Sequence, residues 1–429
     1  MVCWPWEKPL THEEETFYVA VLVKPFLSSP QGRLMKFFTV MRDERLVWHE
    51  DRPLPLGEAI MRRPIDTFLD HCGTLEDRRE AGKVLHPVPE ILLVTLCGVI
   101  AGAEGWEDIE AYGASKLALL REILPFAHGA PSDDTLRRFF RVVDPCVFRE
   151  VFVAFVRDLF PHAGERLIAI DGKTSRRRHD GAARALHLVR AFATEARLVL
   201  AQTAPAEKSH AITAIPALLA LLDLRGATIS MDAMGCQREI AQQMLDGGGH
   251  YLLGLKGNQG TLHEDGQLFF DQPPPCTALQ TYEEADKGHG RIELRRCDVT
   301  SDIGWLQEQH AWPGLQSIAR ITATRIIGTT TTTEVRYSLS DDTAGPVRLL
   351  ANTRSHWAIE NTLHWTLDMS FGDDACRIRQ DNAPLAIATI RHVALNFLQA
   401  AKQKRESIKR LRKQAGWDDD TLKRILKIS

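Results

Sequence analysis

At 429 residues the chain is long enough for two to four domains of roughly 150 residues each. Its composition, 44% hydrophobic and 25% charged, is that of a folded globular protein. A net charge of −3 excludes a uniformly basic nucleic-acid binder, so any contact with nucleic acid must use local patches.

The eight cysteines are scattered without a CxxC pair, which argues against a zinc ribbon or a thioredoxin-like site. The longest apolar run, residues 91–103, is shorter than the roughly 20 residues of a membrane-spanning helix. The chain does not open with a basic stretch followed by an apolar one, so no signal peptide is indicated. We therefore expect a cytoplasmic protein without a membrane partner.

Residues 1–60 share no evident pattern with the rest of the chain. They carry Trp4-Pro5-Trp6 and a run of glutamates at 13–15. One hypothesis is that Met61 is the true start and that the first sixty residues are an upstream read-through. The alternative is a genuine extension of unknown role, and N-terminal sequencing of the natively expressed protein would distinguish the two.

Residues 61–160 show apolar segments at helical spacing, separated by prolines and Gly105. Ser132, followed by two aspartates, predicts the N-cap of a helix that includes Leu136 to Phe140. Short helices with exposed arginines are typical of a helix-turn-helix DNA-binding domain, although any helical bundle would show the same pattern. We interpret this region as a helical, DNA-binding N-terminal domain.

Residues 161–272 predict three antiparallel strands, a helix, and two further strands joined by a helix. The first strand, at 166–171, ends on Asp171, and the fourth, at 227–232, ends on Asp232. This order is that of a ribonuclease H-like core. We therefore predict an α/β fold in which two strands of the catalytic core end on acids.

The remainder predicts three further parts. Residues 273–345 open with three prolines and then read as a β-rich insertion. Residues 346–400 return to helices that complete the core. Residues 401–429 form a basic helix or tail, in which the stretch KQKRESIKRLRKQ holds seven cations and one acid. Such a run is most often a solvated helix face, but in a DNA enzyme it can follow a phosphate backbone.

The third acid is expected on the returning helices. In the segment 354–368, Glu360, His364 and Asp368 stand at i, i+4 and i+8 and so share one helix face. Two aspartates and one glutamate suit two Mg²⁺ ions, with Mn²⁺ as a substitute, about 3.5–4 Å apart for phosphodiester chemistry. Asp171 would then bridge the two ions, and Asp232 and Glu360 would each complete one site.

Other motifs point away from nucleotide or zinc binding. Gly172-Lys173-Thr174 looks like the end of a phosphate-binding loop, but Leu167 stands where the leading glycine is required. The glycines at 254–260 are spaced wrongly for a dinucleotide fingerprint. His356 and His364 lack a nearby third ligand for zinc.

Ordered sequence blocks between Phe68 and Leu398 carry a specific resemblance. They read FLDHCGTLEDRR, LLVTLCGVIAGAEGWEDIEAYG, IAIDGKT, ALHLVRAFA, EKSHAITAIPALL, MDAMGCQREIA, LKGNQGTLHED and RSHWAIENTLHWTLDMSFGDD. The sequence thereby resembles the ISAs-type insertion-sequence transposases, also called H-repeat-associated proteins, of the DDE superfamily. The resemblance implies metal-dependent cutting and joining of DNA at terminal inverted repeats, with Asp171, Asp232 and Glu360 as catalytic and metal-binding acids.

The sequence departs from the family pattern in three places. EKSHA replaces the usual Asn-Glu after Ser, Asp373 of FGDD stands where Glu is commoner, and Arg190 replaces a small residue. None of the three changes touches the triad.

Further residues are expected to contact DNA, namely the terminal inverted repeats and the target, in a homodimeric complex. They are Lys173, Arg176, Arg177, Arg178, Lys256, Asn258, Trp357 and His364. For the basic residues the alternative is an exposed turn, and for each tryptophan it is core packing. The alternative function is a catalytically inactive remnant that binds inverted repeats without cutting them.

Overall fold

The computed structural model describes residues 39–42, 45–48, 63–163, 166–174, 187–205, 211–288 and 290–427. The chain divides into two compact units, Met1–Met61 and Arg62–Ser429. In the first unit the described residues form an antiparallel pair, β1 (Thr39–Arg42) and β2 (Arg45–Trp48). All other described elements belong to the second unit, within which the remaining expected domain boundaries fall.

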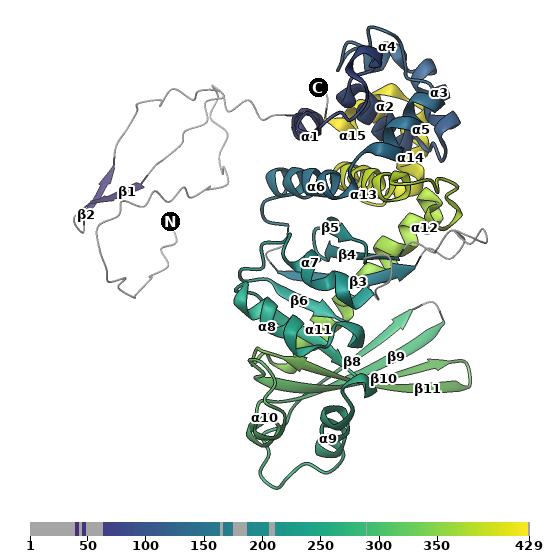
Figure 1. The fold of residues 1–429 in the computed structure, drawn as a ribbon. Coiled ribbons are helices and arrows are strands. Elements are labelled where there is room, and N and C mark those ends of the chain that lie inside the picture. The colour runs from purple at the N-terminus through teal and green to yellow at the C-terminus, as the bar shows by residue number, and fades with distance from the viewer. Residues whose placement is uncertain are drawn as a thin grey trace. The chain divides into compact units, whose positions relative to one another are not determined.

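The second unit is built on one nine-stranded sheet with the order β5-β4-β3-β6-β7-β11-β10-β9-β8 (Figure 1). The strands are β3 (Leu167–Thr174), β4 (His187–Ala193), β5 (Leu198–Thr203), β6 (Thr228–Met231), β7 (His250–Leu255), β8 (Gln280–Gly288), β9 (Arg291–Thr300), β10 (Ser317–Ile327) and β11 (Thr330–Ser340).

The first five strands form a ribonuclease H-like core. β3, β4 and β5 are antiparallel neighbours, whereas β6 and β7 run parallel to β3. The parallel step from β6 to β7 needs a crossover, which α8 (Arg238–Asp246) provides. Residues 167–170 of β3 are buried, as their unbroken apolar run predicts, and the strand becomes partly exposed from Asp171 onward. The predicted fold class is confirmed.

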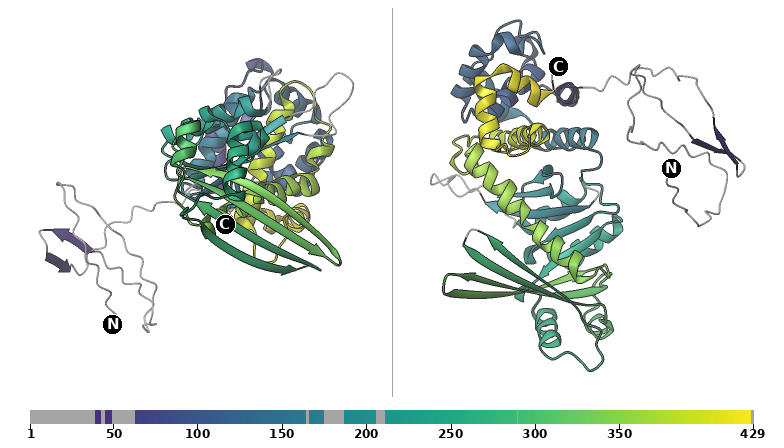
Figure 2. Two further views of the ribbon diagram at one scale, coloured as in Figure 1. Left: turned by 90° about the horizontal axis from the view of Figure 1, so that it is seen from below. Right: turned by 180° about the vertical axis from the view of Figure 1, so that it is seen from behind.

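The β-rich insertion continues the core sheet. β8 to β11 form an antiparallel meander, and β11 pairs with β7 from Tyr337 opposite Leu255 to Ser340 opposite Leu252. The hydrogen-bonded ladder therefore runs without a break from the core into the insertion. Helices α9 (Gly260–Asp271) and α10 (Gly304–His310) lie beside these strands (labelled in Figure 1 and seen from two further sides in Figure 2).

The helical region combines both ends of this unit. Its helices are α1 (Pro64–Cys72), α2 (Val88–Ala101), α3 (Trp106–Ser115), α4 (Leu117–Leu120), α5 (Asp133–Val142), α6 (Pro145–Leu159), α13 (Ala383–Ala401), α14 (Ile408–Trp417) and α15 (Asp419–Leu426). Both α6 and α13 pack on β5, while α2 packs on α13 and α14 (Figure 1). The N-cap predicted at Ser132 is confirmed, because its hydroxyl accepts a bond from the Thr135 amide, at 3.3 Å, at the start of α5.

Within the described residues, no single helix is long and apolar enough to span a membrane; α2 and α3 meet the length and composition test only as a pair bent by 98°.

α13 is fixed to the edge of the sheet by Asn396. Its side-chain amide donates to the Val199 carbonyl and accepts from the Val199 amide, both at 2.9 Å. The buried backbone of the edge strand is thereby hydrogen-bonded from the helix side.

Candidate active site

Asp171 lies in the middle of β3, where the strand changes from buried to partly exposed. The prediction that this strand ends on Asp171 is wrong, because β3 stays paired with β4 as far as Thr174. Its Oδ1 accepts a hydrogen bond from the Gly172 amide at 2.8 Å, and its Oδ2 lies 3.6 Å from Nδ1 of His364. About a quarter of the side chain is exposed. Directly across the antiparallel ladder stands Arg190 of β4. Asp171 is thus held from several sides but remains open to the surface.

Asp232 follows the end of β6 and begins a short 3₁₀ turn. Its Oδ1 accepts from the Met234 amide at 3.1 Å, which caps the turn. The neighbouring strand β7 approaches closely because it has Gly254 at this point, where a Cβ would lie 3.2 Å from the Ala233 nitrogen. Asn258 donates from Nδ2 to the Ala233 carbonyl at 2.7 Å. The turn is therefore fixed from β7, while the Asp232 side chain stays exposed.

Glu360 lies in a π-helical segment, Ile359–His364, between α11 (Pro346–His356) and α12 (Trp365–Phe371). Ile359 and Leu363 of this segment are buried, and Glu360 is exposed. The sequence predicts a helix here but not its wider turns, which often occur at functional sites. At the end of α11, Nδ1 of His356 lies 3.0 Å from the Ser230 hydroxyl and so fixes this helix against β6.

Asp232 and Glu360 act electrostatically on Asp171. The pKa of Asp171 is raised to about 6, first by burial and then by the negative charges of Asp232 and Glu360, while the Gly172 amide and Arg190 act in the opposite direction. Two carboxylates that lie far from Asp171 in the sequence are thus near enough in the fold to act on its charge.

His364 lies beneath these acids. It is 6% exposed, and its pKa is lowered to about 3, mainly by burial and further by the positive charges of Arg190 and Lys173. The imidazole is therefore neutral at physiological pH and faces Asp171. The expected DNA contact of His364 does not fit this position, because the ring has almost no accessible surface.

Lys173 points toward the helix that carries Glu360. It forms an ion pair with Asp368 of α12 and lies 4.0 Å from Asp374, and it is only 15% exposed. In this structure the positive charge of Lys173 is therefore already paired with a carboxylate of α12. Arg176, Arg177 and Arg178 lie outside the described residues, and Lys256 is exposed just after β7.

A buried ionic cluster lies behind the acids, and the sequence does not predict it. Asp373 accepts from Nη2 of Arg190 at 3.3 Å and from Nη1 of Arg391 at 2.7 Å. Nε of Arg190 donates to Nε2 of His392 at 3.1 Å. The one signal in the sequence is that Arg190 and Asp373 both depart from the family pattern. The structure shows that these two residues contact each other.

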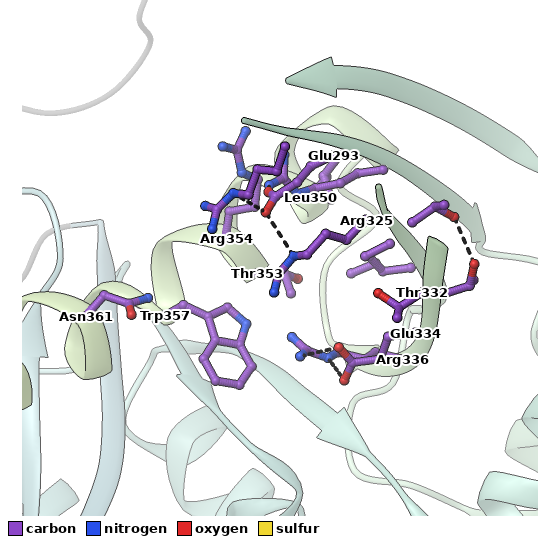
Figure 3. A pocket seen from close by; sticks show the side chains of 16 residues that line it. Glu293, Arg325, Thr332, Glu334, Arg336, Leu350, Thr353, Arg354, Trp357 and Asn361 are labelled. Carbon is purple, nitrogen blue, oxygen red and sulfur yellow. Dashed lines mark hydrogen bonds and ion pairs between the residues drawn. The ribbon is translucent and has the colours of Figure 1, made fainter. Parts of the chain in front are cut away.

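Trp357 lies at the edge of a groove over the insertion strands (Figure 3). The guanidinium of Arg336 lies over its ring, 4.4 Å from the centroid. Five arginines line the groove, at 291, 295, 325, 336 and 354, and each is within 4.0 Å of an acid. Neither Trp357 nor Trp365 is a core residue, since they are 36% and 59% exposed.

Two families of known proteins match the chain. The family described as "Transposase DDE domain" matches residues 162–397, and one described as "DDE_Tnp_1-associated" matches residues 69–156. The H repeat-associated putative transposase YhhI of Escherichia coli K12 is 37% identical over 373 residues, which cover 84% of this chain and 97% of the relative. The chain belongs to the DDE transposase family.

Other relatives of this transposase differ in what their names say about activity. The putative transposase YncI of Escherichia coli O157:H7 is 35% identical, over a match that covers 84% of this chain and 95% of the relative. The inactive transposase YbfQ of Escherichia coli K12 is 46% identical, over 17% of this chain and 84% of its own. A solved piggyBac transposase synaptic complex with hairpin DNA is 11% identical, with a TM-score of 0.40, and covers 85% of this chain and 81% of its own.

The acids of the transposase fit divalent ions by their chemistry. Hard cations such as Mg²⁺ take carboxylate oxygens and retain several waters. In the described part of the chain, no three His, Cys, Asp or Glu side chains surround one common point. The negative charges that contribute to the raised pKa of Asp171 are charges that a cation would neutralise.

Proposed function

We propose that this transposase cleaves DNA at the terminal inverted repeats of an insertion sequence and joins the freed 3′-hydroxyl to target DNA. The observation that carries the proposal is that the charges of Asp232 and Glu360 contribute to the raised pKa of Asp171. The three acids come from the middle of β3, the residue after β6 and a π-helical turn. Acids gathered in this way in a protein of this family suit phosphoryl transfer at a metal centre.

DDE transposases use divalent metal ions, and here we propose two Mg²⁺ ions, for which Mn²⁺ would substitute. When bound, such ions activate a water or a 3′-hydroxyl and stabilise the leaving oxygen. Asp171 would contact both ions, with Asp232 on one and Glu360 on the other.

The protein supplies the surroundings of these acids. The Gly172 amide and the Arg190 charge favour the ionised form of Asp171. The neutral and buried imidazole of His364 lies next to the same carboxylate, with Nδ1 3.6 Å from Oδ2 of Asp171. The ion pair between Lys173 and Asp368 joins β3, which bears Asp171, to α12, which follows the π-helical segment of Glu360.

We further propose where DNA approaches. Lys256, directly after β7, and Trp357, three residues before Glu360, are exposed, and Asn258 fixes the turn that Asp232 begins. These three would contact the end of the element, and Lys173 would join them if its pair with Asp368 opened. Two copies acting together in the DNA complex, in the cytoplasm, complete the proposal.

The test uses purified full-length protein, a labelled duplex carrying the inverted repeat, and Mg²⁺ or Mn²⁺. The wild type should yield nicked and joined products. Asp171→Asn, Asp232→Asn and Glu360→Gln should each reduce product by about 10²–10³-fold or more, since removal of one electrostatic stabiliser commonly costs about 10²–10³-fold. Glu308→Gln, an exposed acid of α10, is the matched control and should retain activity.

Two results would contradict the proposal. Full activity in any of the three variants would remove that residue from the site. Specific binding of the wild type to the repeat without cleavage in either metal would favour an inactive DNA-binding remnant, a possibility consistent with the name of the relative YbfQ.

A further inference from the structure

Five exposed cations on and just before α14 have no acidic partner among the described residues. They are Lys404, Arg405, Lys409, Arg410 and Lys413, which we call the α14 patch together with Trp417. The groove of Figure 3 differs in this respect, because each of its arginines is paired with an acid. Among these two surfaces, the uncompensated positive charge thus lies on α14 and not in the groove.

The patch occupies one side of the helix. At 100° per residue, Lys409, Arg410, Lys413 and Trp417 fall within about 100° of one another. Trp417 at the end of this face is 76% exposed, an unusual position for a large aromatic side chain. The opposite side of the helix is buried and includes Leu411.

α14 is firmly attached to the helices beneath it. Nη2 of Arg412 donates to the Val99 carbonyl of α2 at 2.6 Å, and its guanidinium lies 4.1 Å from the centre of the Phe371 ring. Burial lowers the pKa of Arg412 to about 10, so it remains charged at neutral pH. Phe371 ends α12, which continues directly from the π-helical segment of Glu360. The patch is therefore presented on a rigid support in contact with the helix that carries a catalytic candidate.

The neighbouring acids do not neutralise the patch. Glu406, the only acid in the basic stretch, lies 3.6 Å from Arg424. Asp418 caps α15, and Asp419 pairs with Lys116 at 2.6 Å. Asp420, in the first turn of α15, marks the limit of the patch on that side.

We infer that the α14 patch binds the phosphate backbone of duplex DNA outside the cleavage site. Duplex DNA offers one negative charge per roughly 1.7 Å of axis, which a rigid row of unpaired cations complements. Trp417 adds an apolar contact to the sugar edge at the end of the row. This inference rests on the proposed function for the choice of DNA, but it concerns holding the duplex rather than cutting it.

The test measures binding of full-length protein to the inverted-repeat duplex by fluorescence anisotropy between 50 and 300 mM KCl. Each phosphate contact contributes about 0.9 to the slope of log K against log salt. The variant K404Q/K409Q/R410Q/K413Q should reduce that slope by about 3–4, equally for repeat and unrelated duplexes. Trp417→Ala should weaken binding with little change in slope.

The matched control is R121Q/R157Q/R197Q/K287Q, which removes the same charge at exposed positions elsewhere that likewise have no ion pair with a described acid. It should change the slope by less than about 1, and thermal unfolding should show that both quadruple variants are folded. The inference is overturned if the slope of the α14 variant is unchanged, if the control lowers it equally, or if the wild type binds anionic phosphatidylserine vesicles but not DNA.

The outcome is separable from that of the cleavage assay. Asp171→Asn should bind with the wild-type slope although it does not cut. Loss of slope in the α14 variant, together with a wild type that never cleaves, would support the patch and reject the chemistry. Normal cleavage with an unchanged slope would do the reverse.

Discussion

Asp373→Asn should destabilise the protein severely although it changes only one atom. The carboxylate is 4% exposed and accepts from Arg190 at 3.3 Å and from Arg391 at 2.7 Å. An asparagine of the same shape would remove the carboxylate that both buried guanidinium groups, of Arg190 and Arg391, contact directly. Burying a charge without compensation is far costlier than burying a neutral polar group.

Removing one partner of a buried ion pair typically costs about 3–5 kcal/mol. A total stability of about 5–15 kcal/mol would lose a large share of its value through this one change. We expect the urea midpoint, followed by tryptophan fluorescence at pH 7.5, to fall accordingly. Asp373→Glu is the control, since it keeps the charge and installs the residue that is commoner in the family.

The partner can be tested in the same way. Arg190→Ser in the Asp373→Asn background removes one of the stranded charges, so it should recover part of the loss and give a coupling energy of about 0.5–3 kcal/mol. The contrary result is a free energy of unfolding for Asp373→Asn within about 1 kcal/mol of the wild-type value, as is typical of exposed positions rather than buried pairs. In that case the buried cluster does not stabilise this region.

Three further predictions follow from the site and its supports. The pKa of Asp171 is raised to about 6, so protons should compete with Mg²⁺ below that pH. Thermal stabilisation by Mg²⁺ should grow as the pH rises from about 5 to 7. The stability of the metal-free protein should fall as the pH rises from about 4 to 6, because the folded carboxyl keeps its proton to higher pH than the unfolded one. Asp171→Asn should lose both effects. Gly416→Ala would place a Cβ 2.9 Å from a backbone carbonyl of α2 and should lower the urea midpoint by the equivalent of about 1–3 kcal/mol, while Gly304→Ala, with open space around it, should not. Trp357→Ala should cost about 1–3 kcal/mol in binding a duplex end with one unpaired base, and less with a fully paired end. An equal loss for Trp365→Ala, with none for Trp357→Ala, would assign the base contact to the other ring.

The sequence predicts which elements carry the three candidate acids, because the signal for each element is local. Asp171 and Asp232 follow short apolar runs that can only be buried strands, and the order of strands and helices then limits the fold to few alternatives. Glu360 follows from its position between tryptophans on a returning helix. Its π-helical turn has no comparable local signal, because the wider turn depends on what packs around it.

The contacts that cross the fold could not be predicted in this way. Arg190 and Asp373 are 183 residues apart, and nothing near either residue indicates that both are buried. Pairing of β11 with β7 depends on tertiary register rather than on the composition of either strand. The charge of 402–414 is visible in the sequence, but only the structure shows that Arg412 is buried while its neighbours are free.

The cover of α2 has a consequence for synthesis. This helix is buried along nearly its whole length, and part of its cover is α14, whose Arg412 binds a carbonyl 313 residues earlier in the chain. At about 5–20 residues per second, the ribosome would need about 15–60 s to supply that cover. Until then the apolar sides of α2 are available to chaperones and proteases. A gene copy interrupted before residue 408 should therefore leave little protein in the cell, rather than a stable fragment that competes for DNA ends.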